Sequence, residues 1–127
     1  MLVDDDPNDN YFHQREIKKI ITDITIIEKT SALDALEYLR SNKGNRQMLP
    51  DLIFLDINMP ELDGWEFLEA FSKLDPEIKK VVIIIMLSTS GNPDDILKAM
   101  TYSCVSDYIT KPLTKEIMES IVRRFFN

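Results

Sequence analysis

The chain has few residues that could hold a small protein together through covalent bonds or a metal ion. Its 127 residues include one cysteine, Cys104, and one histidine, His13. A single cysteine cannot close an internal disulfide, and one cysteine with one histidine cannot supply a Cys/His zinc site. We therefore expect Cys104 to pack as a small hydrophobic residue in a protein of the reducing cytoplasm.

Long apolar runs and an excess of positive charge are also missing. The longest apolar run, residues 81–87, is far shorter than the roughly 20 residues that cross a bilayer. No basic stretch followed by an apolar segment opens the chain, so we predict neither a signal peptide nor membrane binding. The formal net charge is −7, and an acidic surface repels the phosphates of nucleic acids. Direct nucleic-acid binding is therefore not expected.

Composition and length are those of one soluble globular domain. Hydrophobic residues make up 44% and charged residues 29% of the chain, and 127 residues are enough to bury a core. No internal repeat or low-complexity stretch divides the chain. We predict a single domain over residues 1–127.

Short apolar runs alternate with longer amphipathic segments. The alternation predicts a doubly wound α/β fold, in which helices cover both faces of a parallel sheet. The first run is very short, so we expect that residues before Met1 are missing or that Met1 is not the natural start. The unbroken run at 81–87 indicates a strand buried on both faces. The predicted strands are 1–3, 24–27, 52–55, 81–87 and 105–109.

Residues that favour helix starts lie between these runs. Pro7 suits the first turn of a helix, where its missing N–H is not needed, and Asp6 can cap that helix. A serine, an asparagine or a threonine stands at three later starts, where a side-chain oxygen can accept a backbone N–H. These are Ser31, Asn92 and Thr114.

Helical spacing of apolar residues predicts which faces of the helices turn inward. Pro76 is predicted to end the third helix, and the last helix is predicted to run to Phe126. The residues expected to face the core from the first three helices are Tyr11, Phe12, Ile17, Ile20, Ile21, Leu33, Leu36, Tyr38, Leu39, Phe67, Leu68 and Phe71.

Polar side chains follow four of the five predicted strands. Parallel strands have their carboxyl ends at one edge of the sheet, and ligands bind there where the strand order reverses. We therefore expect these side chains to share one site. They are Asp4 and Asp5 after the first strand, Asp56 after the third, Ser88 and Thr89 after the fourth, and Lys111 after the fifth.

These residue types indicate phosphoryl transfer. Clustered carboxylates repel one another and need a cation, and all-oxygen ligands favour Mg²⁺ or Mn²⁺. A carboxylate such as Asp56 can attack phosphorus to give an acyl phosphate, while Lys111 and Ser88 stabilise the phosphoryl oxygens. Each residue alone could be an ordinary turn, loop or surface residue. Their joint presence at consecutive strand ends favours the functional interpretation.

Four motifs make the whole chain resemble the receiver domains of bacterial two-component response regulators. One is acidic, one surrounds a phosphoacceptor aspartate, one carries a hydroxyl (serine where threonine is commoner), and one carries a lysine. In this chain they are Val3–Pro7, Leu55–Pro60 with Asp63–Gly64, Met86–Thr89 and Tyr108–Pro112. The resemblance implies a flavodoxin-like (βα)5 sandwich of three layers, with a parallel five-stranded sheet in the order 2-1-3-4-5.

The resemblance also implies what the chain does. A sensor histidine kinase or a histidine phosphotransfer protein would transfer a phosphoryl group to Asp56 beside a bound Mg²⁺. The chain would then be a phosphoacceptor and not an enzyme, although it could catalyse its own phosphorylation and dephosphorylation. The phosphoryl group would contact Ser88, Thr89 and Lys111.

Metal ligands and loop residues follow from the same resemblance. Asp5 and Asp56 would bind Mg²⁺ through their side chains, and Asn58 through its backbone carbonyl. Asp4 would act through a water or a hydrogen bond. The loop after the acceptor would be shaped by Pro60 and Gly64.

Finally, the resemblance implies a switch. The Ser88 hydroxyl would move toward the phosphoryl group and Tyr108 would rotate inward, which changes the surface of the fourth helix, fifth strand and fifth helix. A downstream protein would bind that surface, and the chain would be a monomer or a weak dimer that forms on phosphorylation. The alternative for Tyr108 is a core aromatic residue with its hydroxyl in water.

Three other functions compete. A phosphatase of the haloacid-dehalogenase class would need an aspartate two residues after the nucleophile, where this chain has Asn58. A flavodoxin-like nucleotide-binding module would need a glycine-rich or hydroxyl-rich loop after the first strand, where Asp4–Asp6 would repel phosphate. A degenerate receiver used only for docking would not need the complete set of site residues.

Overall fold

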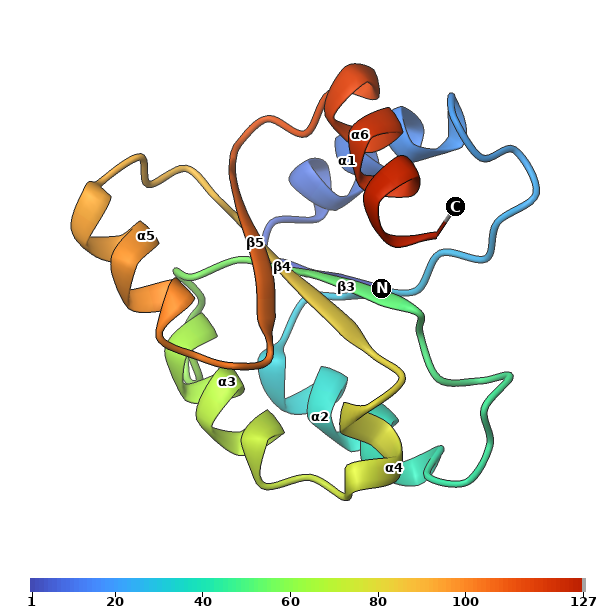
Figure 1. Ribbon diagram of the computed structural model, residues 1–127, viewed down its shortest axis with the longest axis vertical. Coiled ribbons are helices and arrows are strands. Elements are labelled where there is room, and N and C mark those ends of the chain that lie inside the picture. The colour runs from blue at the N-terminus through green and yellow to red at the C-terminus, as the bar shows by residue number, and fades with distance from the viewer. Residues whose placement is uncertain (127) are drawn as a thin grey trace.

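The computed structural model describes residues 1–126, which form a three-layer α/β sandwich (Figure 1). Five parallel strands make one sheet in the order β2-β1-β3-β4-β5. The predicted fold class and strand order are therefore confirmed. The strands are β1 (Leu2–Val3), β2 (Glu28–Lys29), β3 (Leu52–Leu55), β4 (Ile83–Ser88) and β5 (Val105–Thr110).

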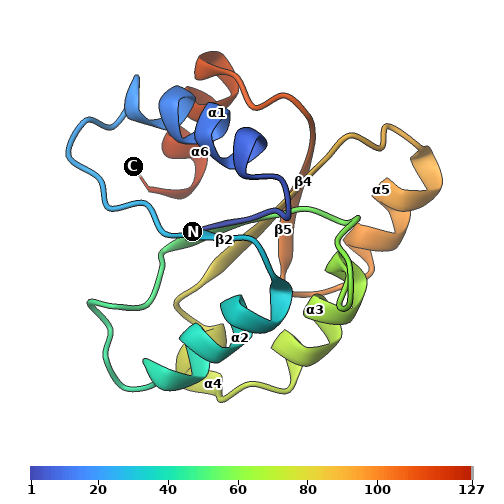
Figure 2. The same cartoon turned by 180° about the vertical axis from the view of Figure 1, so that it is seen from behind.

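Helices cover both faces of the sheet, and Figure 2 shows the same layers from behind. One face carries α1 (Pro7–Lys18) and α6 (Lys115–Phe125). The other face carries α2 (Ala32–Ser41), α3 (Gly64–Ser72), the one-turn α4 (Pro76–Lys79) and α5 (Pro93–Met100). None of the helices in residues 1–126 is long and apolar enough to span a membrane.

Each face of the sheet has its own hydrophobic cluster. β4 contributes to both: Ile84 and Met86 pack under α2 and α3, whereas Ile85 packs toward α1 and α6. All three side chains are fully buried, which confirms the prediction of a strand covered on both sides. The predicted inward face of α3 is also confirmed, because Phe67, Leu68 and Phe71 are fully buried.

The strand predicted at residues 24–27 is wrong by a few residues. The strand is β2 at Glu28–Lys29, and its two residues pair with Leu2 and Val3 of β1. Ile27 contributes only its carbonyl, which accepts a hydrogen bond from the Leu2 amide at 2.8 Å. The hydrogen-bonded ladder with β1 therefore begins at Glu28, four residues later than predicted.

The predicted faces of the first two helices are partly wrong. Tyr11 is 59% and Phe12 is 46% exposed, and Leu33 at the start of α2 is 49% exposed. In α1 the inward stripe is instead Asn10, His13 and Ile17, which are all nearly inaccessible. Spacings of three and four residues place that stripe on one side of the helix, and Tyr11 and Phe12 on the other.

Pro76 begins a helix rather than ending one, which corrects the prediction. α3 stops at Ser72, and Pro76 is the first residue of α4, capped by the Asp75 side chain. Proline is favoured there because the first amides of a helix have no intrahelical acceptor. The predicted caps Asp6, Ser31, Asn92 and Thr114 are confirmed, since each side chain accepts a backbone N–H of its helix.

A capping box that the sequence interpretation missed starts α3. The Asp63 carboxylate accepts the Glu66 amide at 2.9 Å, and the Glu66 carboxylate accepts the Asp63 amide at 3.1 Å. Asp63→Ala removes one of these bonds and the anion near the helix N-terminus, so we expect it to lower the free energy of unfolding by about 1 kcal/mol. Urea denaturation measures the loss. Asp63→Asn keeps an acceptor oxygen and should retain most of the stability; equal losses in both variants would contradict the capping role.

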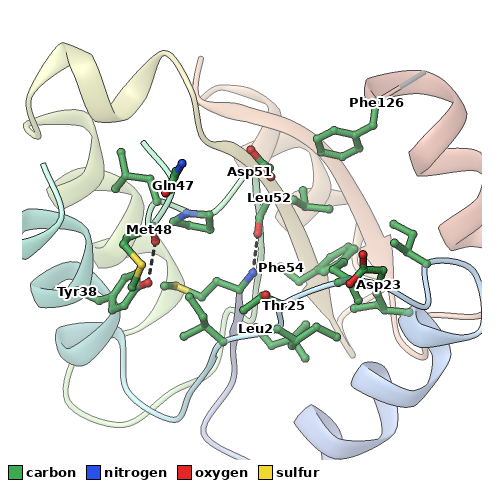
Figure 3. Close-up of a pocket in the computed structure, with 18 of the residues that line it drawn as sticks. Leu2, Asp23, Thr25, Tyr38, Gln47, Met48, Asp51, Leu52, Phe54 and Phe126 are labelled. Atoms are coloured by element: carbon green, nitrogen blue, oxygen red, sulfur yellow. Dashed lines mark hydrogen bonds between the residues drawn. The ribbon is translucent and has the colours of Figure 1, made fainter. Parts of the chain in front are cut away.

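A groove of about 840 Å³ lies at the end of the sheet where β1 and β3 begin (Figure 3). Its walls are mainly apolar, and they include Leu2, Ile17, Ile24 and Phe54. The Met1 nitrogen donates to the Leu52 carbonyl at 2.7 Å beside this groove. None of the residues predicted for the functional site lines this groove.

Candidate functional site

The carboxyl ends of four strands bring the predicted polar residues to one edge of the sheet. Asp4 directly follows β1, Asp56 directly follows β3, Ser88 is the last residue of β4, and Lys111 directly follows β5. The Asp56 amide donates to the Val3 carbonyl at 3.0 Å, which continues the β1–β3 pairing up to the acids. The sheet itself therefore sets the position of each group.

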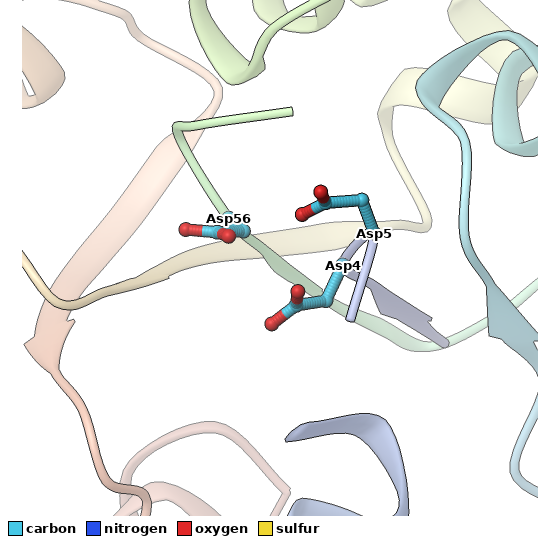
Figure 4. Close-up of side chains that lie close together, drawn as sticks. All are labelled: Asp4, Asp5 and Asp56. Atoms are coloured by element: carbon cyan, nitrogen blue, oxygen red, sulfur yellow. The ribbon is translucent and has the colours of Figure 1, made fainter. Parts of the chain in front are cut away.

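Three carboxylates form the acidic part of the site (Figure 4). One oxygen each from Asp4, Asp5 and Asp56 lies within 4.8 Å of the others. Asp4 and Asp56 are buried, whereas Asp5 is exposed at the rim. An all-oxygen donor set with one open side suits a hard cation that keeps part of its water shell, so these residues fit Mg²⁺.

Lys111 links the acids through its ammonium group. The Nζ atom donates to Asp4 Oδ2 at 2.7 Å and to Asp9 Oδ2 at 2.9 Å, and it lies 3.5 Å from Asp56 Oδ2. Its side chain is only 9% exposed. Burial alone would lower the pKa of Lys111, but the hydrogen bonds that it donates to Asp4 and Asp9 outweigh burial and raise the pKa. Lys111 therefore stays positively charged at neutral pH.

Asp56 is a buried carboxylate with an altered affinity for protons. Burial raises its pKa from 3.8 to about 6, and the neighbouring Asp4 adds to the rise. Lys111 and the Ile57 amide, which donates to Asp56 Oδ1 at 2.8 Å, act in the opposite direction. Asp56 is thus mainly ionised at neutral pH but easily protonated below it.

The hydroxyl residues at the end of β4 differ in exposure. Ser88 is fully buried, and its Oγ accepts the Ser90 amide at 3.2 Å, whereas Thr89 is exposed. The Lys111 amide donates to the Ser88 carbonyl at 2.7 Å and joins the ends of β4 and β5. Tyr108 is half-buried, and its hydroxyl donates to the Ser90 carbonyl at 2.7 Å. Both predicted switch residues therefore contact Ser90.

The loop after Asp56 packs tightly on the acceptor residue. The Gly64 amide donates to the Ile57 carbonyl at 2.7 Å. A Cβ atom on Gly64 would overlap the Asp56 carbonyl oxygen and lie 2.8 Å from the Ile57 Cα. Glycine is required here by this close approach. Asn58 and Pro60 are exposed, and the predicted metal contact of the Asn58 carbonyl stays a prediction.

Three residues of α1 border the site and were not predicted as part of it. Asp9 binds Lys111, the Asn10 side chain donates to the Asp4 carbonyl at 3.0 Å, and His13 is buried beneath them. Burial, followed by the nearby Lys111 charge, lowers the pKa of His13 and keeps its ring neutral. Polar residues at positions 10 and 13 share a helix face with Ile17, and that spacing could have revealed them.

Comparisons with known proteins agree with this geometry. The family model of the response regulator receiver domain matches residues 1–123. The sensor histidine kinase CheAY of Helicobacter pylori is 30% identical over 124 residues. That match covers 98% of this chain but only 14% of the kinase, so the chain spans a small part of that relative.

Solved structures share the fold over nearly the whole chain. A two-component response regulator from Cytophaga hutchinsonii is 30% identical, with a TM-score of 0.89, and the match covers 99% of this chain and 94% of that one. The phosphorylated cyanobacterial phytochrome response regulator RcpA is also 30% identical, with a TM-score of 0.81 and coverage of 99% and 91%. The sequence motifs, the sheet order and these matches together show that this chain belongs to the response regulator receiver domain family.

Proposed function

We propose that this chain accepts a phosphoryl group on Asp56 from a sensor histidine kinase or a histidine phosphotransfer protein. Accepting phosphoryl groups is general to the receiver family. The observation that carries the proposal is the surroundings of Asp56: it lies 3.5 Å from the Lys111 ammonium and is clustered with Asp4 and Asp5. A nucleophile, an acidic cation site and a fixed positive charge therefore occur together.

The proposed reaction needs little beyond positioning and charge neutralisation. An Asp56 carboxylate oxygen forms a bond to phosphorus while the bond from phosphorus to the histidine nitrogen of the donor breaks, and the imidazole keeps the electron pair. The Lys111 ammonium places a full positive charge beside the phosphoryl oxygens, and the Ser88 hydroxyl donates a hydrogen bond to one of these oxygens. Bound Mg²⁺ would neutralise further charge on these oxygens.

The contacts of Asp4 support the proposed division of metal ligands. Both of its oxygens already accept hydrogen bonds, Oδ2 from Lys111 at 2.7 Å and Oδ1 from the Asp6 amide at 3.0 Å. Asp4 is therefore proposed to act through a bound water, while Asp5 and Asp56 bind Mg²⁺ directly, together with the Asn58 carbonyl. Mg²⁺ usually retains several waters in such sites.

We further propose that the chain is a phosphoacceptor switch and not an enzyme that turns over a separate substrate. A phosphatase that uses an aspartyl phosphate needs a second proton-transfer group near the nucleophile. At the corresponding position this chain has Asn58, whose amide cannot serve. The single histidine, His13, is only 3% exposed on the inner face of α1, so its burial does not favour it as a replacement.

The proposed output surface is formed by α5, β5 and α6. These are the fourth helix, fifth strand and fifth helix of the sequence prediction, which did not include the one-turn α4. Movement of Ser88 toward a phosphoryl group would disturb its bond to Ser90, and Ser90 is also bound by the Tyr108 hydroxyl. A change at Asp56 would thereby reach the start of α5, a helix whose later residues Leu97 and Met100 are 68% and 51% exposed. We propose that a downstream protein binds there, with the domain a monomer or a weak phosphorylation-dependent dimer.

The test is phosphorylation by a small phosphodonor. In the presence of Mg²⁺ and acetyl phosphate, intact-mass spectrometry should show one added phosphoryl group on the unaltered chain and none on Asp56→Asn. Omission of Mg²⁺ should also abolish the adduct. Because an acyl phosphate can hydrolyse quickly, beryllofluoride binding is measured in parallel by NMR. Neither an adduct nor beryllofluoride binding in a folded protein would reject the proposal.

A further inference from the structure

We propose that Asp9 holds the Lys111 ammonium away from Asp56 and thereby limits how strongly the site binds a phosphoryl group. This inference rests on the proposed phosphoacceptor function and concerns the regulation of the same site. Asp9 lies outside the acidic cluster that fits the metal. It would act as a positioning residue, through Lys111, rather than on the phosphoryl group.

The distances show how the ammonium is shared. Lys111 Nζ makes hydrogen bonds with Asp4 and Asp9 at 2.7 and 2.9 Å, whereas the Asp56 oxygen at 3.5 Å is an ion-pair contact only. An ammonium has three N–H donors, and the hydrogen bonds to Asp4 and Asp9 use two of them. Two strong acceptors on the α1 side therefore keep the charge displaced from the acceptor aspartate.

Asp9 cannot easily follow Lys111 if the ammonium moves. It lies in the first turn of α1, whose start is fixed by the Asp6 cap and by the Asn10 bond to the Asp4 carbonyl. The Asp9 carboxylate is also favoured where it is, because the helix N-terminus carries partial positive charge. A shift of Lys111 toward Asp56 would therefore lengthen or break the Asp9 contact.

Phosphorylation of Asp56 favours a shift of the Lys111 ammonium toward Asp56. The phosphoryl group brings more negative charge and three strong acceptor oxygens to the Asp56 side of the ammonium. To donate to a phosphoryl oxygen, Lys111 must then move toward Asp56 from the position set by its two hydrogen bonds, and Asp9 accepts the longer of the two. The Asp9 contact stabilises only the unphosphorylated arrangement. Its free energy is lost when Lys111 moves, so the contact weakens binding of a phosphoryl group.

The test compares beryllofluoride affinity at saturating Mg²⁺, measured by NMR titration, in four proteins. Asp9→Asn should bind beryllofluoride about tenfold more tightly than the unaltered chain, which lies within the usual range of coupling between two sites. Asp9→Glu keeps the carboxylate and should stay within about twofold. Asp6→Asn removes an equal charge from the same turn while it keeps a capping oxygen, and it controls for general electrostatics. Circular dichroism checks folding of each variant.

Failure of the restraining role and failure of the phosphoacceptor proposal give different results. If the unaltered chain binds beryllofluoride and Asp9→Asn binds with equal or lower affinity, the restraining role is wrong while the phosphoacceptor proposal stands. An equal gain in beryllofluoride affinity in Asp6→Asn would also contradict the restraining role, because the loss of one negative charge would then explain the gain. If the unaltered, folded chain binds no beryllofluoride, the phosphoacceptor proposal fails and this inference fails with it.

Discussion

Replacement of Asp56 by asparagine will stabilise the metal-free protein at neutral pH by about 2 kcal/mol. The pKa of Asp56 rises from 3.8 to about 6, chiefly through burial. Each pKa unit corresponds to about 1.4 kcal/mol, which gives about 3 kcal/mol, and relaxation of the site around the buried charge reduces this to about 2 kcal/mol. Asparagine has nearly the same shape and no charge, so it avoids this cost.

The sign of the pH dependence follows from the same shift. The folded state binds the Asp56 proton more tightly than the unfolded state, so this group favours folding below pH 3.8. That contribution is lost as the pH rises from 3.8 to about 6. The stability advantage of Asp56→Asn over the unaltered chain should therefore be small near pH 4 and reach its full size by pH 7.

Urea denaturation across this pH range, without divalent cations, measures the difference. Saturating Mg²⁺ should reduce the advantage of the variant, because the cation stabilises the folded state that retains the Asp56 ligand. A variant that is less stable than the unaltered chain at pH 7 without metal would show that Lys111 more than compensates the burial of Asp56. If the stability advantage of Asp56→Asn does not change with pH, it comes from packing and not from the ionisation of Asp56.

Replacement of Gly64 by alanine will destabilise the protein by about 3 kcal/mol, at the upper end for an overpacked site. The added methyl group would meet the Asp56 carbonyl oxygen and the Ile57 Cα, and both belong to the backbone. Backbone atoms cannot rotate aside as a flexible side chain can, so the loop or the start of α3 must move. The movement would also break the Gly64–Ile57 hydrogen bond.

Gly91→Ala is the matched control, because nothing lies within 4 Å of a Cβ atom built there. Its stability should match that of the unaltered chain within about 0.5 kcal/mol, as is usual for an open surface position. Thermal and urea unfolding measure both variants. Gly64→Ala should also slow phosphorylation by acetyl phosphate, since the displaced backbone carries Asp56. Similar stabilities for the two alanine variants would show that the loop can relax freely.

Much of the fold and site could be predicted because local patterns and topology agree here. The apolar run at 52–55 lies on the observed β3, and alternation of strands and helices restricts the topology to a doubly wound sheet. In such a sheet the residue after each strand points to a shared edge, so Asp56 and Lys111 were placed together although 55 residues separate them in sequence. The receiver motifs led to the same residues.

The sequence by itself determined the fold class, the strand order through its family resemblance, and the residue types gathered at the carboxyl edge. Tertiary structure alone decided that β2 starts at Glu28 and that Tyr11 and Phe12 face outward, because pairing with β1 and docking of α1 select among near-equal local alternatives. It also decided which acids share Lys111. Asp9 reaches that ammonium only through the packing of α1 beside the end of β5, and no local pattern encodes a distance between side chains so far apart in the chain.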